Sequence, residues 1–253
     1  MKKFTYLILL SISILFLNSC KKVEEALPKD PPVTEQENPT NPQPRPGDAD
    51  AVLVALQTVT YTAVGGTTIE TALGMPIAIF LDGDNFKDVG AVSCEGESLD
   101  KMDNNSYIYM PSASNPMGIT YSGNIAWNIT GGSGFPAHSI EVKGSFPGNV
   151  EIAATTGEQI STAASYTLKT KINIANADSV YFGIYGTKDG IMSIQPANVS
   201  SHTFSAAEME SIGKGTGYMQ IAAVKTVKKE TLRTGEVIYY MTEKVNTTSI
   251  TLN

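Results

Sequence analysis

Alternation of apolar and polar residues is the feature that most restricts how this chain can fold. In the stretch YTLKTKINI (residues 166–174), Tyr166, Leu168 and Ile172 share one side of an extended backbone, and the lysines share the other. A period of two predicts a β-strand with one buried face.

Similar stretches recur after residue 50, separated by turns rich in Gly, Ser and Pro, and no long helical period interrupts them. The expected strands are 76–81, 90–95, 106–110, 124–130, 180–185, 217–227, 237–241 and 248–252. Residues 217–227 and 237–241 should form a hairpin joined by a charged loop around 228–230. Ser205 and Glu208 form a capping box, which predicts a single turn of helix.

This pattern predicts an all-β fold made of antiparallel sandwiches. The chain after residue 49 is long enough for two immunoglobulin-like sandwiches of about 100 residues each, or for one large sandwich. Gly148, Gly157 and a run of small residues favour a boundary between them. We therefore expect one domain at 50–150 and a second at 151–253.

The N-terminus has the three parts of a secretory signal peptide. Lys2 and Lys3 are followed by an apolar stretch from Phe4 to Leu17 and then by small or polar residues. This stretch has 14 residues, fewer than the roughly 20 that a membrane-spanning helix needs. Residues 1–19 are accordingly expected to be a signal peptide.

The tetrapeptide Leu17-Asn18-Ser19-Cys20 resembles the lipobox of bacterial lipoproteins. In that family the cysteine becomes the first mature residue and carries acyl chains, which implies lipid attachment at Cys20. The expected partner is a membrane, reached through the N-terminal lipid anchor. Several acyl chains on one residue anchor a protein stably, whereas a single chain binds reversibly.

Residues 20–49 should form a spacer between this anchor and the sandwiches. Seven of the 13 prolines lie there, and large apolar residues are almost absent, so the stretch cannot bury enough surface to fold. Lys21-Lys22-Val23-Glu24-Glu25 resembles the export signals of Bacteroidetes lipoproteins. That resemblance implies the outer membrane and its outward face; the periplasmic face is the alternative.

Three segments of the body, NNSYIYMPSASNPMGITYS, AWNITGGSGFPAHS and GSFPG, resemble a group of Bacteroidetes envelope lipoproteins. The resemblance covers most of the chain after the spacer. The group has no assigned activity, so it implies location and β architecture only.

Charge and motifs exclude several classes of function. Loss of Lys2 and Lys3 with the signal peptide takes the formal net charge from −7 to −9, which disfavours nucleic acid as a partner. Once Cys20 is lipidated, Cys94 is the only cysteine left, and it should be a small buried residue. His138 and His202 belong to no metal-binding or catalytic motif, and surface positions are favoured for both. We expect no enzyme, no cofactor and no metal.

The loop with Asp82, Asp84 and Asp88 raises a calcium hypothesis, because carboxylates suit a hard cation. Phe86 stands where an EF-hand loop needs a ligand, and Asp and Gly are common in any β-turn. The turn interpretation is favoured.

The candidate ligand face is Tyr181 with Tyr185. Val180 and Phe182 should point into the core, so the tyrosines should point outward and leave a depression above Gly183. Ordinary cross-strand packing is the favoured alternative. Trp127 alternates with isoleucines on the core side and should be buried.

Ser179 lies in Asp-Ser-Val, which resembles the O-glycan acceptor motif of Bacteroidetes envelope proteins. This makes Ser179 a candidate O-glycosylation site.

Two functions fit these features. The first is a lipid-anchored, non-catalytic binding or adhesion module at the cell surface, with a glycan or another envelope protein as its partner. The alternative is a fimbrillin-like structural or pilus-associated subunit.

The anchor is testable by Cys20→Ala. Without the thiol no acyl chain can be attached, so lipoprotein-type cleavage should fail and the protein should remain as precursor or leave the membrane fraction. Metabolic labelling with a fatty acid and membrane fractionation measure both effects. Wild-type processing and fractionation of the variant would show that Leu17–Cys20 is not a lipobox.

Overall fold

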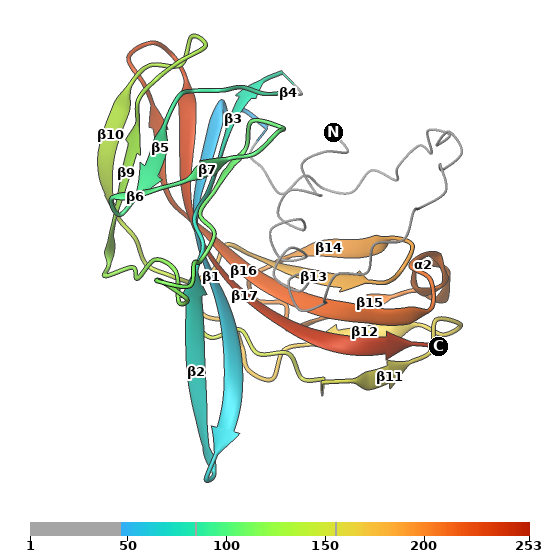
Figure 1. The fold of residues 1–253 in the computed structure, drawn as a ribbon. Helices are drawn as coiled ribbons and strands as arrows, with labels where there is room; N and C mark the ends of the chain where they lie inside the picture. Colours follow the sequence, from blue (N-terminus) through green and yellow to red (C-terminus); the bar gives the residue numbers. More distant parts are fainter. Residues whose placement is uncertain (1–46, 84, 155) are drawn as a thin grey trace, which may run out of the picture. The chain divides into compact units, whose positions relative to one another are not determined.

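The fold is described from a computed structural model, which describes residues 47–83, 85–154 and 156–253; Cys20 and the spacer before residue 47 lie outside these ranges. The described chain is mostly β, with one short helix, as the sequence predicts (Figure 1). The strands are β1 (Ala51–Val64), β2 (Thr67–Gly74), β3 (Ile77–Asp82), β4 (Asn85–Phe86), β5 (Val92–Cys94), β6 (Glu97–Ser98), β7 (Asp100–Lys101), β8 (Tyr107–Ile108), β9 (Asn124–Ile129), β10 (His138–Lys143), β11 (Glu158–Ile160), β12 (Tyr166–Lys169), β13 (Ser179–Tyr185), β14 (Gly190–Pro196), β15 (Ser201–Phe204), β16 (Gly215–Thr231) and β17 (Val237–Leu252).

The helix α2 (Ala206–Ser211) has the predicted capping box. Ser205 accepts a hydrogen bond from the Glu208 backbone N–H, and the Glu208 carboxylate accepts one from the Ser205 backbone N–H. The capping-box prediction is confirmed.

One 11-stranded sheet runs through the described chain in the order β14-β13-β16-β17-β1-β3-β8-β7, with β11, β2 and β4 attached beside this path. A four-stranded sheet, β10-β9-β5-β6, and a two-stranded sheet, β12-β15, complete the fold. β1 and β11 pair with β17 in parallel. The expectation of purely antiparallel sheets is therefore wrong: β1 and β17 come from opposite ends of the body, so no short turn constrains their direction.

The hairpin β16–β17 is longer than the sequence predicts. Its register runs from Gly215 opposite Leu252 to Thr231 opposite Val237, with a bulge near Thr226. The charged residues 228–230 lie inside β16 and not in a loop, because they pair with residues 238–240 of β17. Their side chains form ion pairs, Lys228 with Glu230 at 3.2 Å and Lys229 with Asp48 at 2.5 Å.

Two hydrophobic clusters form the interior. The first combines strands from the N-terminal half with Ile238 and Tyr240 of β17, and it buries Trp127 (3% exposed) and Cys94 as predicted. The second is built from residues 150–223 together with Ile250 and Leu252. The hairpin thus serves both clusters, while the division into domains at residue 150 stays a prediction.

Polar side chains of β17 lie between the two clusters. Asn246, 7% exposed, accepts a hydrogen bond from the Ile152 N–H at 3.0 Å and donates one to the Val59 carbonyl at 2.8 Å. Val59 is the last residue of β1 that pairs with β17. The amide of Asn246 therefore satisfies two buried backbone groups at the position where β1 leaves the sheet.

Beyond Val59, β1 pairs only with β2, and the two strands form a hairpin arm, residues 60–73, that extends away from the sheet (Figure 1). Gly65 and Gly66 form its turn, both with positive φ (57° and 84°). This is the conformation that a two-residue hairpin turn requires.

We expect Asn246→Ala to destabilise the fold by about 2–4 kcal/mol, because two buried backbone groups lose their partner at about 1–3 kcal/mol each. Urea unfolding followed by Trp127 emission measures the change. Thr248→Ala is the control: Thr248 lies on the same strand, and among the described residues its side chain bonds only the Thr156 hydroxyl, at 3.4 Å. This substitution should change stability by less than about 0.5 kcal/mol. Equal effects of both substitutions would contradict the role given to Asn246.

Candidate binding site on the outer face of β9 and β10

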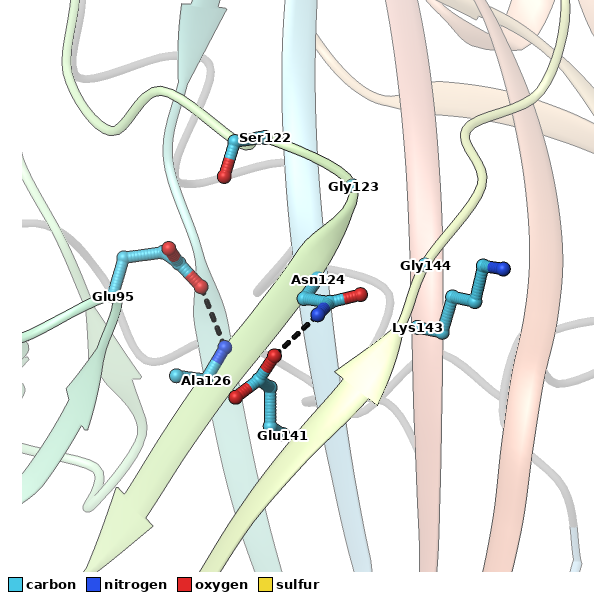
Figure 2. Close-up of a pocket in the computed structure, with 8 residues that line it drawn as sticks. All are labelled: Glu95, Ser122, Gly123, Asn124, Ala126, Glu141, Lys143 and Gly144. Atoms are coloured by element: carbon cyan, nitrogen blue, oxygen red, sulfur yellow. Dashed lines mark hydrogen bonds between the residues drawn. The ribbon is translucent and has the colours of Figure 1, made fainter.

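The candidate site is a pocket on the polar face of the four-stranded sheet. Along β9, Ile125, Trp127 and Ile129 are buried, and the residues between them are exposed. The outward residues of β10 lie beside them, with Glu141 opposite Ala126 and Lys143 opposite Asn124. The pocket has a volume of about 520 Å³ (Figure 2). It is lined by Glu95, Ser122, Gly123, Asn124, Ala126, Glu141, Lys143 and Gly144.

Glu95 enters the pocket from a tight turn. Glu95 and Gly96 form the turn that joins β5 to β6, and both residues have positive φ (52° and 81°). The Glu95 backbone N–H donates to the Ala126 carbonyl at 2.8 Å, and the Ala126 N–H donates to the Glu95 carboxylate at 2.5 Å. Two bonds to one residue of β9 fix the carboxylate beside the sheet.

Glu141 is held by its neighbour across the strands, because the Asn124 side-chain amide donates to its Oε1. Within the described residues, the second oxygen of each carboxylate has no hydrogen-bond partner, and neither has the ammonium group of Lys143. The pocket therefore offers fixed acceptors and one cationic donor to a ligand.

Groups of this kind suit a polar ligand with several hydroxyl or amino groups. The lining is polar or small and contains no aromatic side chain among the described residues. Recognition would therefore depend on hydrogen bonds and not on stacking. The sequence analysis missed this site; the available signal was the alternation in NIAWNI and HSIEVK, which places Asn124, Glu141 and Lys143 on one outward face.

The tyrosine pair does not form an exposed face. The predicted alternation is confirmed, since Val180, Phe182 and Ile184 belong to the second cluster and the tyrosines do not. Tyr181 and Tyr185 are nevertheless only 8% and 7% exposed, so the expected ligand face is wrong.

Two contacts contribute to the burial of Tyr185. The Tyr185 ring stacks on Tyr218 with 4.7 Å between centroids. It also fills the expected depression: a Cβ added at Gly183 would lie 2.6 Å from the Tyr185 hydroxyl. The face that carries the tyrosines is also buried elsewhere in the sheet. Besides the polar Gln220 and Glu243, its buried members are mainly apolar and include Val52, Val54, Leu56, Ile77, Ile79, Ala222, Val224 and Val245.

Ser179 is half-buried at the start of β13, between Pro196 and Val224. O-glycosylation at Ser179 stays a prediction, as does lipid attachment at Cys20, which lies outside the described residues.

The acidic loop after β3 is a structural turn. Asp84 is not described; Asp82 is paired with Asn85 in the short β3–β4 hairpin. Asp88 accepts hydrogen bonds from Lys101, the Gly90 N–H and the Tyr107 hydroxyl. These bonds, that of Lys101 above all, lower the pKa of Asp88 to about 2. Among the described residues, no three His, Cys, Asp or Glu side chains form a group that could hold a metal ion.

Both histidines are half-buried, which corrects the expectation of surface positions. His138 Nε2 lies 2.8 Å from the Tyr240 hydroxyl and 3.5 Å from Glu230 Oε2. His202 packs edge-on against Phe204 at 4.7 Å. Both serve packing within the fold.

Comparisons with known proteins assign the chain to no family. No family model and no curated protein matches the chain. A solved structure described as the N-terminal four Ig domains of Dscam1 isoform 8.4 is similar at 11% identity and a TM-score of 0.23. That match covers 87% of this chain and 48% of the other, so this chain spans about half of that structure's length. None of the helices in the described part of the chain is long and apolar enough to span a membrane.

The bonds of Asp88 predict an acid-dependent contribution to stability. Its folded pKa of about 2 lies below the ordinary aspartate pKa of 3.8, so the stabilisation is present above pH 3.8 and is lost as the pH falls through about 2. Asp88→Asn should lower the urea midpoint at pH 7, and the gap to wild type should close on acidification.

Asp103→Asn, in the exposed loop before β8, is the control for the loss of one negative charge. A gap between Asp88→Asn and wild type that stays constant from pH 7 to pH 2 would contradict the proposed bonds.

Proposed function

We propose that the chain is a lipid-anchored, non-catalytic binding module of the cell envelope that presents two immunoglobulin-like sandwiches to the exterior. The observation that carries this proposal is the pocket on the outer face of β9 and β10, with its two oriented carboxylates and the Lys143 ammonium. The lipobox at Leu17–Cys20 and the proline-rich spacer support the location.

A glycan is the ligand class that fits the pocket best. Each carboxylate has one oxygen committed to a protein donor and one that can accept a hydrogen bond from a sugar hydroxyl or amino group. Two carboxylates against one ammonium give a negative site, which favours neutral or amino sugars over acidic ones.

A structural subunit, fimbrillin-like or pilus-associated, is the second candidate. The observation that favours it is the projecting β1–β2 arm, whose backbone groups are open to a partner strand. Electron microscopy of the purified protein distinguishes the two functions, because a structural subunit would form filaments.

A glycan array that includes neutral, amino and acidic sugars tests the binding function. Wild type should bind a neutral or amino glycan. Glu95→Gln or Glu141→Gln should weaken that binding by about ten- to a hundredfold, because a hydrogen bond to a charged group is worth about 1.5–3 kcal/mol.

The matched control is Glu97→Gln, which removes an exposed carboxylate of β6 outside the pocket. It should bind like wild type. Absence of glycan binding, or binding that neither pocket substitution weakens, would overturn the assignment.

A further inference from the structure

The outer edge of β2 carries unused backbone hydrogen-bonding groups. At the base of the arm, Gly74 donates its N–H to the Met117 carbonyl and accepts the Ile119 N–H, so the backbone of Gly74 faces away from β1. Met75 instead donates to Leu56 of β1. Because successive residues of a strand alternate, Thr68, Glu70 and Ala72 turn their N–H and C=O groups to the same outer edge.

Within the described residues, no strand pairs with this edge between Thr67 and Leu73. Protein edges are ordinarily protected by lysine, proline, a bulge or a covering loop. The edge sequence TTIETAL contains neither lysine nor proline and has a single charged residue, Glu70. Its register with β1 is continuous from Thr67 to Gly74. A two-stranded arm is also only marginally stable alone in water. The arm therefore has the features of a strand that pairs with another one.

The side chains of the edge support pairing with an identical strand. Ile69 is 49% exposed and is one of three exposed large apolar residues in the described chain. The charge of Glu70 is compensated within its own copy, because Lys244 Nζ lies 3.1 Å from its Oε1 and the Tyr61 hydroxyl donates to its Oε2 at 3.1 Å. Two such edges can approach without the repulsion that unpaired carboxylates would cause.

We infer that two copies of this chain associate through their β2 edges, which pair antiparallel about a two-fold axis at Ile69. In this register, Thr68 lies opposite Glu70 of the other copy, and both residues have their backbone groups on the outer edge. They exchange N–H···O bonds on both sides of the axis, which gives four bonds in all. The inference goes beyond the proposed function and does not rest on it.

The same register places the side chains favourably. Ile69 lies opposite Ile69 of the other copy in a non-hydrogen-bonded pair, in which side chains approach most closely. Thr67 faces Thr71, and Glu70 faces the Thr68 hydroxyl and not the second Glu70. The contact is isologous and closes on itself, so it produces dimers and not filaments.

Disulfide cross-linking of the full chain in detergent tests the pairing. In a Cys20→Ala background the remaining thiol, Cys94, is buried. In Ile69→Cys the two new thiols face each other across the axis, and mild oxidation should give a covalent dimer. We expect the dimer to form at least about tenfold faster than from random collision, because pairing raises the effective thiol concentration from micromolar towards millimolar.

Ile172→Cys is the matched control, since Ile172 is 43% exposed and lies outside the arm. Thr71→Cys tests the register: in the proposed dimer its two copies lie about 13 Å apart at ~3.3 Å per residue and should not cross-link. A mixture of the Thr67→Cys and Thr71→Cys variants should cross-link, because these positions face each other.

Trp127 emission confirms that each variant is folded. Cross-linking of Ile69→Cys no faster than that of Ile172→Cys would overturn the pairing. Equally fast cross-linking of Thr71→Cys would overturn the register and with it the inference.

Discussion

The long ladder between β16 and β17, interrupted by one bulge near Thr226, is the constraint on which the rest of the structure depends. One end of this hairpin gives Ile238 and Tyr240 to the first hydrophobic cluster, and the other gives Ile250 and Leu252 to the second. Neither cluster can lose its hairpin segment without disturbing a ladder that the other cluster uses. The stabilities of the two clusters should therefore be coupled, which separately folded sandwiches joined by a linker would not show.

A polar stretch of β17 makes this shared ladder specific. Thr242, Lys244 and Asn246 are buried between the two clusters, where an unsatisfied polar group would cost free energy. Each finds a partner from elsewhere in the chain: Thr242 donates to the Ser145 carbonyl at 2.9 Å, Lys244 pairs with Glu70, and Asn246 bonds Val59 and Ile152. A slip of β17 by one residue would place these groups on the opposite face. They consequently fix the register of β17, the exit of β1 and the base of the arm together.

Local features of the fold could be predicted from the sequence, because their causes lie within a few residues. Trp127 and Cys94 are buried, and Ser205 caps its helix, as alternation and capping chemistry require. The sequence pattern could not show whether the second face of a strand is exposed or buried. Alternation assigns Tyr181 and Tyr185 to one side but does not say whether that side meets solvent. The run AVLVAL in β1 was the available warning, since a strand apolar on both faces is typical of a sheet buried on both sides. The pocket was missed because Glu95 reaches β9 only through the pairing of β5 with β9.

Pairing through the arm would compensate for the low affinity expected of a single pocket. An open site that relies on two carboxylates and one ammonium, without an aromatic platform, offers few contacts per ligand, so single-site affinity should be low. Pairing of two copies through β2 would give a dimer with two pockets. Binding at the second pocket then becomes intramolecular, and avidity can exceed the affinity of one site by about 10²–10⁴ without a new contact. The gain requires a ligand that spans both pockets, so a repetitive glycan would benefit and a free monosaccharide would not.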